Sequence, residues 1–375
     1  MGLREKLKEM GIIFFRMGIQ YFENWPATPM ATPGVEQRIS RRAWEARRHD
    51  NLHILWVCDD NTANNPYNLR NAINKYTKHE CKLVQGKQTY LGYPLDGTIM
   101  AEDITRTEFI SLVLWADVIH LNESVVSGIY PPEHDKYFKD GTRINLYDIF
   151  QPHQKVFRHS NGTYYRNNFK YLNYLCEKHN MYKTVSTPDL ISLGSNNYWL
   201  PQPIPLDQPK YKIRARWSDK IRVSHSPTNR VIKGTDTFLA VCKSRFPDME
   251  VVLIEKMTHG ECLKARKKCL VHYDQYSLGA YGVASLEALS IGQVCIVGID
   301  NIFQYIPDSP FVEIDGPYPE NMEDALIRAR NIASDEDNYK AYCKKAKEYL
   351  VYHHSDKVVV KRLCDMYEHA GFYIP

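Results

Sequence analysis

The segment 269–298, CLVHYDQYSLGAYGVASLEALSIGQVCIVG, holds residue types that suit the binding of a nucleotide. A polar loop with Gly279 and Gly282 leads into 281–291, where apolar residues recur at helical spacing until a glycine ends the predicted helix. Free N–H groups and the dipole at the start of a helix favour a phosphate. Glu287 lies about two turns into the helix, too far along to touch that phosphate, but its carboxylate can accept hydrogen bonds from the vicinal hydroxyls of a sugar. The pattern therefore indicates a nucleotide site, with simple packing of a strand on a helix as the alternative.

The elements that must position this loop are predicted from apolar runs along the chain. Runs 269–273 and 294–297 frame the loop and its helix and are typical of buried strands. Strand, loop, helix and strand in this order form the unit of a parallel α/β sheet. The same patterns predict strands at 52–58, 116–121, 155–159, 221–225 and 250–254, and helices at 69–76, 236–246, 260–268, 322–333, 338–349 and 357–369.

The loop and its helix also match a known motif. The spacing G-x-Y-G-x-x-x-L-E-A-L-x-x-G over 279–292 resembles the donor-site signature of retaining glycosyltransferases of family 4. The sequences TPDL at 187–190 and WLPQPI at 199–204 are similar to the end of that family's first domain. The resemblance implies the α/β fold called GT-B, in which two Rossmann-like domains face each other across a cleft and a C-terminal helix crosses back to the first domain. Glu287 matches the second of two glutamates in the family motif, whereas Gly279 stands where the family carries the first.

The resemblance further implies a nucleotide-sugar donor, with UDP as the expected nucleotide. The residues expected to bind this donor are Asn229, Asp274, Gln275, Gly279, Ala280, Tyr281, Gly282, Val283 and Glu287. Neither a covalently bound cofactor nor a metal held by the protein is expected. Asp59 and Asp60 are interpreted as caps of a strand end, because two neighbouring carboxylates lack a third ligand.

Four residues are candidates for the catalytic chemistry. Arg230 and Lys233 follow the predicted strand 221–225, and Lys-Gly-Thr at 233–235 matches the family. Two cations beside a helix start can hold a pyrophosphate and stabilise it as a leaving group, although two solvated loop charges are the alternative. His159 and Asn161 lie in a segment similar to the family's His-Gly-Ser loop and are expected to orient the donor sugar. A strand-end histidine bonded to backbone fits the sequence equally.

No protein nucleophile is expected, because the resemblance implies transfer with retention, in which a donor phosphate oxygen takes the acceptor's proton. Loops at the carboxyl ends of parallel strands bind ligands, so the polar loop after 52–58 is expected to border the acceptor. The candidate acceptor-side residues are Asn61, Thr62, Asn64 and Arg166.

The acceptor itself is open to several interpretations. A lipid-linked or cell-surface glycan is favoured, because the basic amphipathic segment 1–22 suits a membrane surface. DNA with hydroxymethylated bases is the alternative, through the arginines of 38–48 and the basic stretch 137–183. A second alternative is a nucleotide-sugar epimerase, or a non-catalytic nucleotide-binding protein, of the same fold.

Length and composition limit the class of protein that the sequence can encode. A chain of 375 residues suffices for two domains, and 43% hydrophobic with 25% charged residues is typical of a globular protein. A net charge of +4 gives little reason for a nucleic-acid partner, and nine cysteines without a CxxC pair indicate reduced thiols. We therefore expect a cytoplasmic enzyme, or one that is peripheral at a membrane surface. The predicted domains are an N-terminal helical and linker extension (1–50), an acceptor-side domain (51–205), a nucleotide-sugar domain (206–350) and a crossover helix (351–375).

Overall fold

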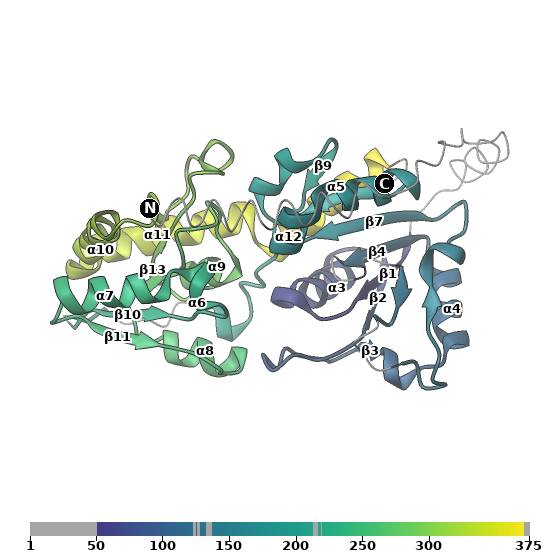
Figure 1. Ribbon diagram of the computed structural model, residues 1–375, viewed down its shortest axis with the longest axis horizontal. Helices are drawn as coiled ribbons and strands as arrows, with labels where there is room; N and C mark the ends of the chain where they lie inside the picture. The colour runs from purple at the N-terminus through teal and green to yellow at the C-terminus, as the bar shows by residue number, and fades with distance from the viewer. Residues whose placement is uncertain are drawn as a thin grey trace, which may run out of the picture.

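The computed structural model describes residues 51–122, 125, 128–132, 137–212, 217–218 and 220–370. Two large parallel β-sheets lie side by side along the long axis of the molecule, each with helices packed against it (Figure 1). The segments 1–22 and 38–48, on which the membrane and DNA interpretations rest, lie outside the described residues. Those interpretations stay predictions.

The first sheet has seven parallel strands in the order β3-β2-β1-β4-β7-β8-β9. The strand β1, third in this order, reads HILWVC and is almost entirely buried, as expected for an interior parallel strand. The strand order reverses between β1 and β4, which is the place where open α/β sheets bind ligands. The strands are β1 (His53–Cys58), β2 (Glu80–Gln85), β3 (Thr98–Met100), β4 (Val118–Asn122), β7 (Lys155–Ser160), β8 (Tyr182–Val185) and β9 (Asn197–Trp199), and the helices are α3 (Asn65–Tyr76), α4 (Arg106–Trp115) and α5 (Thr163–Lys178).

The second sheet has five parallel strands in the order β11-β10-β12-β13-β14. Its order reverses between β10 and β12, so the loops that follow these two strands adjoin at one edge. The strands are β10 (Arg222–His225), β11 (Glu250–Leu253), β12 (Val271–Tyr273), β13 (Val294–Val297) and β14 (Val312–Glu313), and the helices are α6 (Arg230–Lys233), α7 (Thr235–Arg245), α8 (His259–Arg266), α9 (Val283–Ser290) and α10 (Pro319–Ser334).

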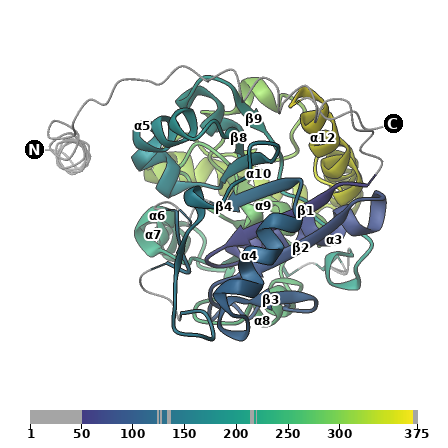
Figure 2. The same cartoon turned by 90° about the vertical axis from the view of Figure 1, so that its right-hand side faces the viewer.

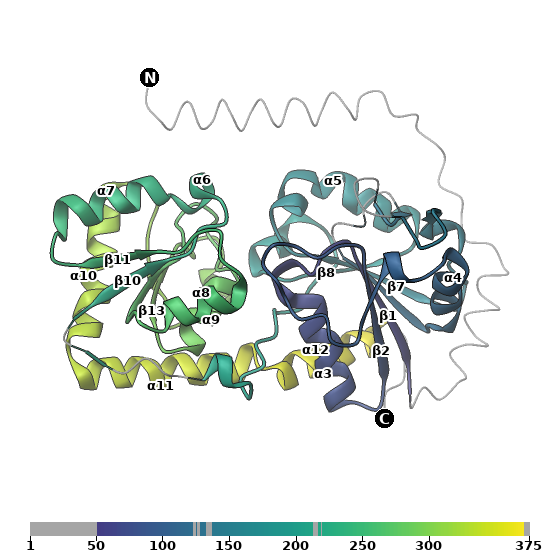
Figure 3. The same ribbon diagram turned by 90° about the horizontal axis from the view of Figure 1, so that it is seen from below.

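Two helices at the end of the chain join the domains. The helix α11 (Glu336–His353) packs along the second domain, and α12 (Asp356–His369) lies against α3 of the first (Figure 3). Figure 2, viewed along the long axis, shows α12 and α3 together at one side of the first domain. Val359, Leu363 and Tyr367 of α12 are buried in the same core cluster as Trp56 of β1. The expected fold of two Rossmann-like domains with a returning C-terminal helix is confirmed.

The chain passes between the domains twice, and both crossings meet at one place. Ile204 forms a parallel bridge with Ser355, and its N–H donates to the carbonyl of His354 at 2.7 Å. The ring of His354 has no exposed surface and bonds to the carbonyl of Gln202 at 3.0 Å and to the hydroxyl of Tyr281 at 3.0 Å. The predicted boundary at 205–206 falls in the first crossing, and the predicted boundary at 350–351 falls inside α11. Both boundaries stay predictions.

Short elements complete the described fold. They are a hairpin of β5 (Ile129–Tyr130) and β6 (Ile144–Asn145) and the 3-10 helices η1 (Thr62–Asn64), η2 (Ala101–Asp103), η3 (Leu146–Asp148), η4 (Pro188–Leu193), η5 (Pro209–Tyr211) and η6 (Phe303–Tyr305). The helix α3 begins at Asn65, earlier than predicted, because Pro66 fits the first helical turn, where its missing N–H costs nothing.

We predict that Tyr367→Phe lowers the free energy of unfolding by about 1–3 kcal/mol, the cost of leaving a buried polar group without a partner. The hydroxyl of Tyr367 lies 2.7 Å from Nε2 of His120, which has no exposed surface. The Nδ1 atom of His120 already has no hydrogen-bond partner among the described residues. Urea denaturation measures the loss, with Tyr352→Phe as control because Tyr352 is 71% exposed. Equal losses in the two variants would contradict this role of α12.

Candidate functional site

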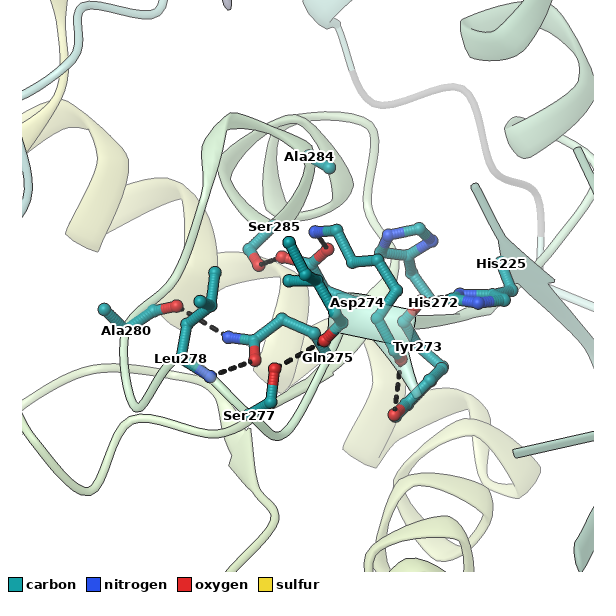
Figure 4. A network of polar contacts seen from close by, with 12 residues as sticks. His225, His272, Tyr273, Asp274, Gln275, Ser277, Leu278, Ala280, Ala284 and Ser285 are labelled. Carbon is teal, nitrogen blue, oxygen red and sulfur yellow. Dashed lines mark hydrogen bonds and ion pairs between the residues drawn. The ribbon is translucent and has the colours of Figure 1, made fainter. Parts of the chain in front are cut away.

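The loop between β12 and α9 is held by a buried glutamine. Gln275 has no exposed surface, its Nε2 donates to the carbonyl of Ala280 at 2.7 Å, and its Oε1 accepts from the N–H of Leu278 at 2.8 Å (Figure 4). One side-chain amide thus spans the turn that precedes the helix. The side chain of the expected donor residue Gln275 is thus bonded within the loop itself.

The start of α9 carries unpaired donors at the carboxyl edge of the second sheet. Gly282 is the N-cap residue and offers no side chain to cap the helix. The N–H groups of Gly282, Val283 and Ala284 donate to no acceptor in the described part of the chain. Such groups, together with the helix dipole, are chemically suited to an anion.

A buried carboxylate stands beside these donors. Asp274 is 2% exposed and accepts from the hydroxyl of Ser285 at 2.5 Å (Figure 4). It also forms an ion pair and hydrogen bond with Lys233. Burial raises the pKa of Asp274, but Lys233 and the hydrogen bond from Ser285 outweigh burial and leave the pKa below its ordinary value. The ionised carboxylate therefore fixes the ammonium of Lys233 at this loop.

Arg230 is held away from that pair. Its Nε and one terminal nitrogen each lie 2.7 Å from the carboxylate of Glu255, and a further contact of 3.3 Å reaches Asp236. The side chain of Arg230 is 45% exposed, and exposed ion pairs of this kind are weak. Asn229 caps α6 by accepting from one of its N–H groups. Arg230 and Lys233, expected to converge on one anion, therefore hold separate carboxylates in this structure.

Gly279 adopts a backbone that disfavours a glutamate. Its φ is +61°, and a Cβ at this position would lie 2.2 Å from Nδ2 of Asn301 and 2.8 Å from Oδ1 of Asp300. Strain and steric overlap together account for glycine where the family motif has its first glutamate. The loop after β13 places the carboxylate of Asp300 beside Gly279. Asp300 is exposed and forms no ion pair within the described residues.

Gly279→Ala should lower the free energy of unfolding by more than Gly141→Ala. Both glycines have positive φ, +61° and +73°, so both alanines bear a left-handed backbone cost of about 1–2 kcal/mol. Nothing lies within 4 Å of a Cβ at Gly141, whereas the Cβ at Gly279 meets Asn301. Denaturant titration of both variants measures the difference. Equal losses would show that Asn301 moves aside freely, and the steric explanation would then be wrong.

Glu287 is buried between two partners and is 5% exposed. Its Oε1 accepts from Nε2 of His259 at 2.6 Å and its Oε2 accepts from Arg266 at 3.4 Å. Burial raises the pKa of Glu287, but His259 and Arg266 outweigh burial and leave the pKa below its ordinary value. Burial, and after it the charge of Glu287, raises the pKa of the neighbouring Tyr211 phenol. Because a carboxylate accepts about four hydrogen bonds, Glu287 keeps capacity for sugar hydroxyls.

Two of the predicted donor residues, Ala280 and Tyr281, have buried side chains. Tyr281 is 2% exposed, and its ring packs 5.2 Å from that of Phe311. Ala280 is 1% exposed, and its carbonyl accepts from the buried glutamine of the loop. Their side chains belong to the core of the second domain.

The first sheet ends in a cluster of asparagines. Nδ2 of Asn61 donates to Asn64 at 2.8 Å, and Nδ2 of Asn64 donates to Asn68 at 3.0 Å. Ala63 and Asn64 both have positive φ, 54° and 58°, a backbone that is uncommon outside glycine. The predicted acceptor residues Asn61 and Asn64 are therefore buried and bonded to each other, and the side chain of Thr62 lies outside the described part of the structure.

His159 lies behind this cluster and has no exposed surface. Its ring bonds to Asn65 at 2.8 Å and to Thr184 at 2.6 Å, and burial lowers its pKa to about 3. Direct contact between His159 and a donor sugar does not fit this burial. Asn161 is half-buried, accepts from Asn65 at 3.3 Å and donates to Asn122 at 3.0 Å. Of the two predicted residues, Asn161 is the one with surface to offer a ligand.

The cations of this edge are matched by carboxylates. Arg166 lies on α5, and its Nε bonds to Asp189 at 2.7 Å. Lys87 pairs with Asp59 at 2.9 Å. The predicted acceptor residue Arg166 thus fastens α5 to η4.

The sequence patterns missed the residues that hold these groups in place. They are Asn65, Asn122, Thr184, His259, Arg266 and Ser285. For His259 the one local signal is the capping box of Thr258 and Glu261, which marks the start of a helix. Its bond to Glu287 joins residues 28 positions apart, which no local pattern reports.

Within the described ranges, no group of three or more His, Cys, Asp and Glu side chains is placed to hold a metal ion. All nine cysteines are free. None of the helices described is both long and apolar enough to cross a membrane.

No protein-family model matches the sequence, and no curated protein matches it. Solved structures resemble the fold over most of the chain. A glycosyltransferase from Rickettsia africae aligns with a TM-score of 0.59 at 10% identity, covering 85% of this chain and 98% of that one. Anabaena HepE, in complex with UDP and glucose, aligns with a TM-score of 0.59 at 10% identity, covering 84% and 99%. Sucrose-phosphate synthase from Thermosynechococcus elongatus aligns with a TM-score of 0.57 at 12% identity, covering 85% and 99%. At such identities the likeness shows that the chain shares the fold, the GT-B architecture.

Proposed function

We propose that this protein is a glycosyltransferase that moves a sugar from a nucleotide-diphosphate donor, UDP-linked, to a hydroxyl of a glycan with retention of configuration. The start of α9 supports this most directly, because its unpaired N–H groups lie in a loop that also fixes the ammonium of Lys233. Glu287 follows on the same helix, where a carboxylate suits the hydroxyls of a ribose. The HepE structure of the same architecture holds UDP and glucose, which agrees with a nucleotide-sugar donor.

The diphosphate of the donor would lie at the start of α9. An ammonium has several N–H donors, so Lys233 keeps some for a phosphate while it is bonded to Asp274. Arg230 is exposed, so it can exchange Glu255 for a second phosphate oxygen at little cost. Preorganised N–H groups and cations of this kind stabilise the charge that develops on a leaving diphosphate.

The chemical step needs no protein nucleophile in this proposal. The bond between the anomeric carbon and the phosphate oxygen breaks, the acceptor oxygen bonds to that carbon from the same face, and a donor phosphate oxygen takes the acceptor's proton. Asn161 at the end of β7 would orient the donor sugar. His159 acts only through Asn65, because it is fully buried.

The chemistry of the first sheet's edge favours a neutral acceptor. Side-chain amides both donate and accept hydrogen bonds, which matches the hydroxyls of a sugar. Lys87 and Arg166 are each balanced by a carboxylate, so these side chains leave little surplus charge for the phosphates of DNA. We therefore favour a glycan acceptor and keep the predicted cytoplasmic location.

Replacing Lys233 by Met together with Asp274 by Asn should weaken UDP binding by at least about tenfold, the loss of roughly one charge-assisted hydrogen bond. The double variant avoids a buried carboxylate without a partner, which would itself be destabilising. Isothermal titration with UDP measures the affinity. Lys220→Met, at an exposed lysine paired with Glu250, is the matched control and should bind as the wild type does. Unchanged affinity in the double variant would remove Lys233 from the site.

Sugar transfer to neutral oligosaccharides should exceed transfer to hydroxymethylated duplex DNA. Labelled sugar from UDP-sugar donors is followed into each acceptor at about 0.15 M salt, where non-specific binding to phosphates is weakened. Label in the DNA with none in the oligosaccharides would overturn the choice of acceptor. Turnover of the donor to its epimer would instead overturn the transferase assignment.

A further inference from the structure

The buried pair of Glu287 and His259 is joined to the first domain. His259 is the first residue of α8, and the N–H of that residue donates to the carbonyl of Leu91 at 2.8 Å. The ring of Tyr93 lies 4.9 Å from the ring of His259. Leu91 and Tyr93 belong to the loop between β2 and β3, so a loop of the first domain contacts the residue that holds Glu287 in the second.

This loop is fastened to its own domain at both ends. At its beginning the ammonium of Lys87 pairs with the carboxylate of Asp59. The main-chain N–H of Lys87 also donates to the main-chain carbonyl of Asp59 at 2.8 Å. At its end Arg70 bonds to the carbonyl of Gly97 at 2.9 Å and to that of Asp96 at 2.5 Å. A loop anchored in this way transmits the position of the first domain rather than moving independently of it.

The start of α8 is fixed equally firmly. Thr258 and Glu261 form a capping box, in which the Thr258 hydroxyl accepts from the N–H of Glu261 at 3.4 Å and the Glu261 carboxylate accepts from the N–H of Thr258 at 3.0 Å. A Cβ at Gly92 of the first-domain loop would lie 3.6 Å from the methyl group of Thr258. The ring of His259 is thus placed by its own helix and by the opposing domain together.

We propose that His259 is the positioning residue through which the first domain orients Glu287 toward the ribose of the donor, an inference that rests on the proposed function. The Nε2–H of His259 and the guanidinium of Arg266 each occupy one oxygen of the carboxylate, which fixes its plane. The remaining lone pairs accept from the two vicinal hydroxyls of the ribose. Nucleotide affinity then depends on Tyr93, a residue of the first domain.

The ribose hydroxyls themselves provide the test. Titration calorimetry compares the affinity for UDP with that for 2′,3′-dideoxy-UDP in the wild type, Glu287→Ala, His259→Ala and His259→Gln. Two hydrogen bonds to a carboxylate make the wild type favour UDP by at least about tenfold. That preference should fall to within about twofold in His259→Ala and recover in large part in His259→Gln, whose amide also donates.

The loop of the first domain offers a matched pair of variants. Tyr93 is 8% exposed and lies against His259, whereas Tyr90 of the same loop is 63% exposed. Tyr93→Leu should reduce the preference for UDP, and Tyr90→Leu should keep it. Circular dichroism and thermal melting confirm that each variant is folded.

The outcomes separate the two levels of the proposal. Loss of preference in Glu287→Ala with full preference in folded His259→Ala and Tyr93→Leu would overturn the positioning role and leave the nucleotide site standing. A wild type that does not bind UDP, or a Glu287→Ala variant that still discriminates as the wild type does, would overturn the proposed ribose contact and this inference with it.

Discussion

The fully buried ring of His354 is the point on which the arrangement of the two domains depends. The ring bonds to the carbonyl of Gln202 in the first crossing of the chain. The main-chain carbonyl of His354 accepts from the N–H of Ile204. Burial lowers its pKa to about 3, so the ring stays neutral and its hydrogen bonds do not change near neutral pH. Its remaining nitrogen meets the hydroxyl of Tyr281 at 3.0 Å, in the loop that precedes α9. The crossing between the domains and the loop before α9 are therefore parts of one packed unit.

Charge in the second domain is buried in matched sets. Asp274 is paired with Lys233, and Glu287 is held by His259 and Arg266. Removing one partner of such a set leaves an uncompensated charge in the interior, which costs several kcal/mol (about 3–5). The matched charges therefore hold Asp274, Lys233, Glu287, His259 and Arg266 in fixed positions within the second domain.

The two sheet edges differ in chemistry, and the difference matches a division of tasks. The second sheet ends in cations and unpaired helix N–H groups, which suit an anionic donor. The first ends in amides such as Asn61, Asn65 and Asn161, bonded to one another or to a neutral histidine. Amides suit neutral hydroxyls, and Asn161, half-buried, has surface to offer one, whereas Asn61 and Asn65 are buried.

Local pattern by itself determined much of this protein: the parallel strands, the helices that follow them, and the glycine loop that starts α9. These features depend on apolar runs, helical spacing and turn residues, which are written within a few neighbouring positions. Only the tertiary structure decided that His159 is buried, that Arg230 binds Glu255, and that Gly279 leaves no room for a side chain. It also paired Glu287 with His259 across 28 positions and Asn65 with His159 across 94. Such contacts depend on which separate elements pack together, and the apolar pattern within one element does not say which elements those are.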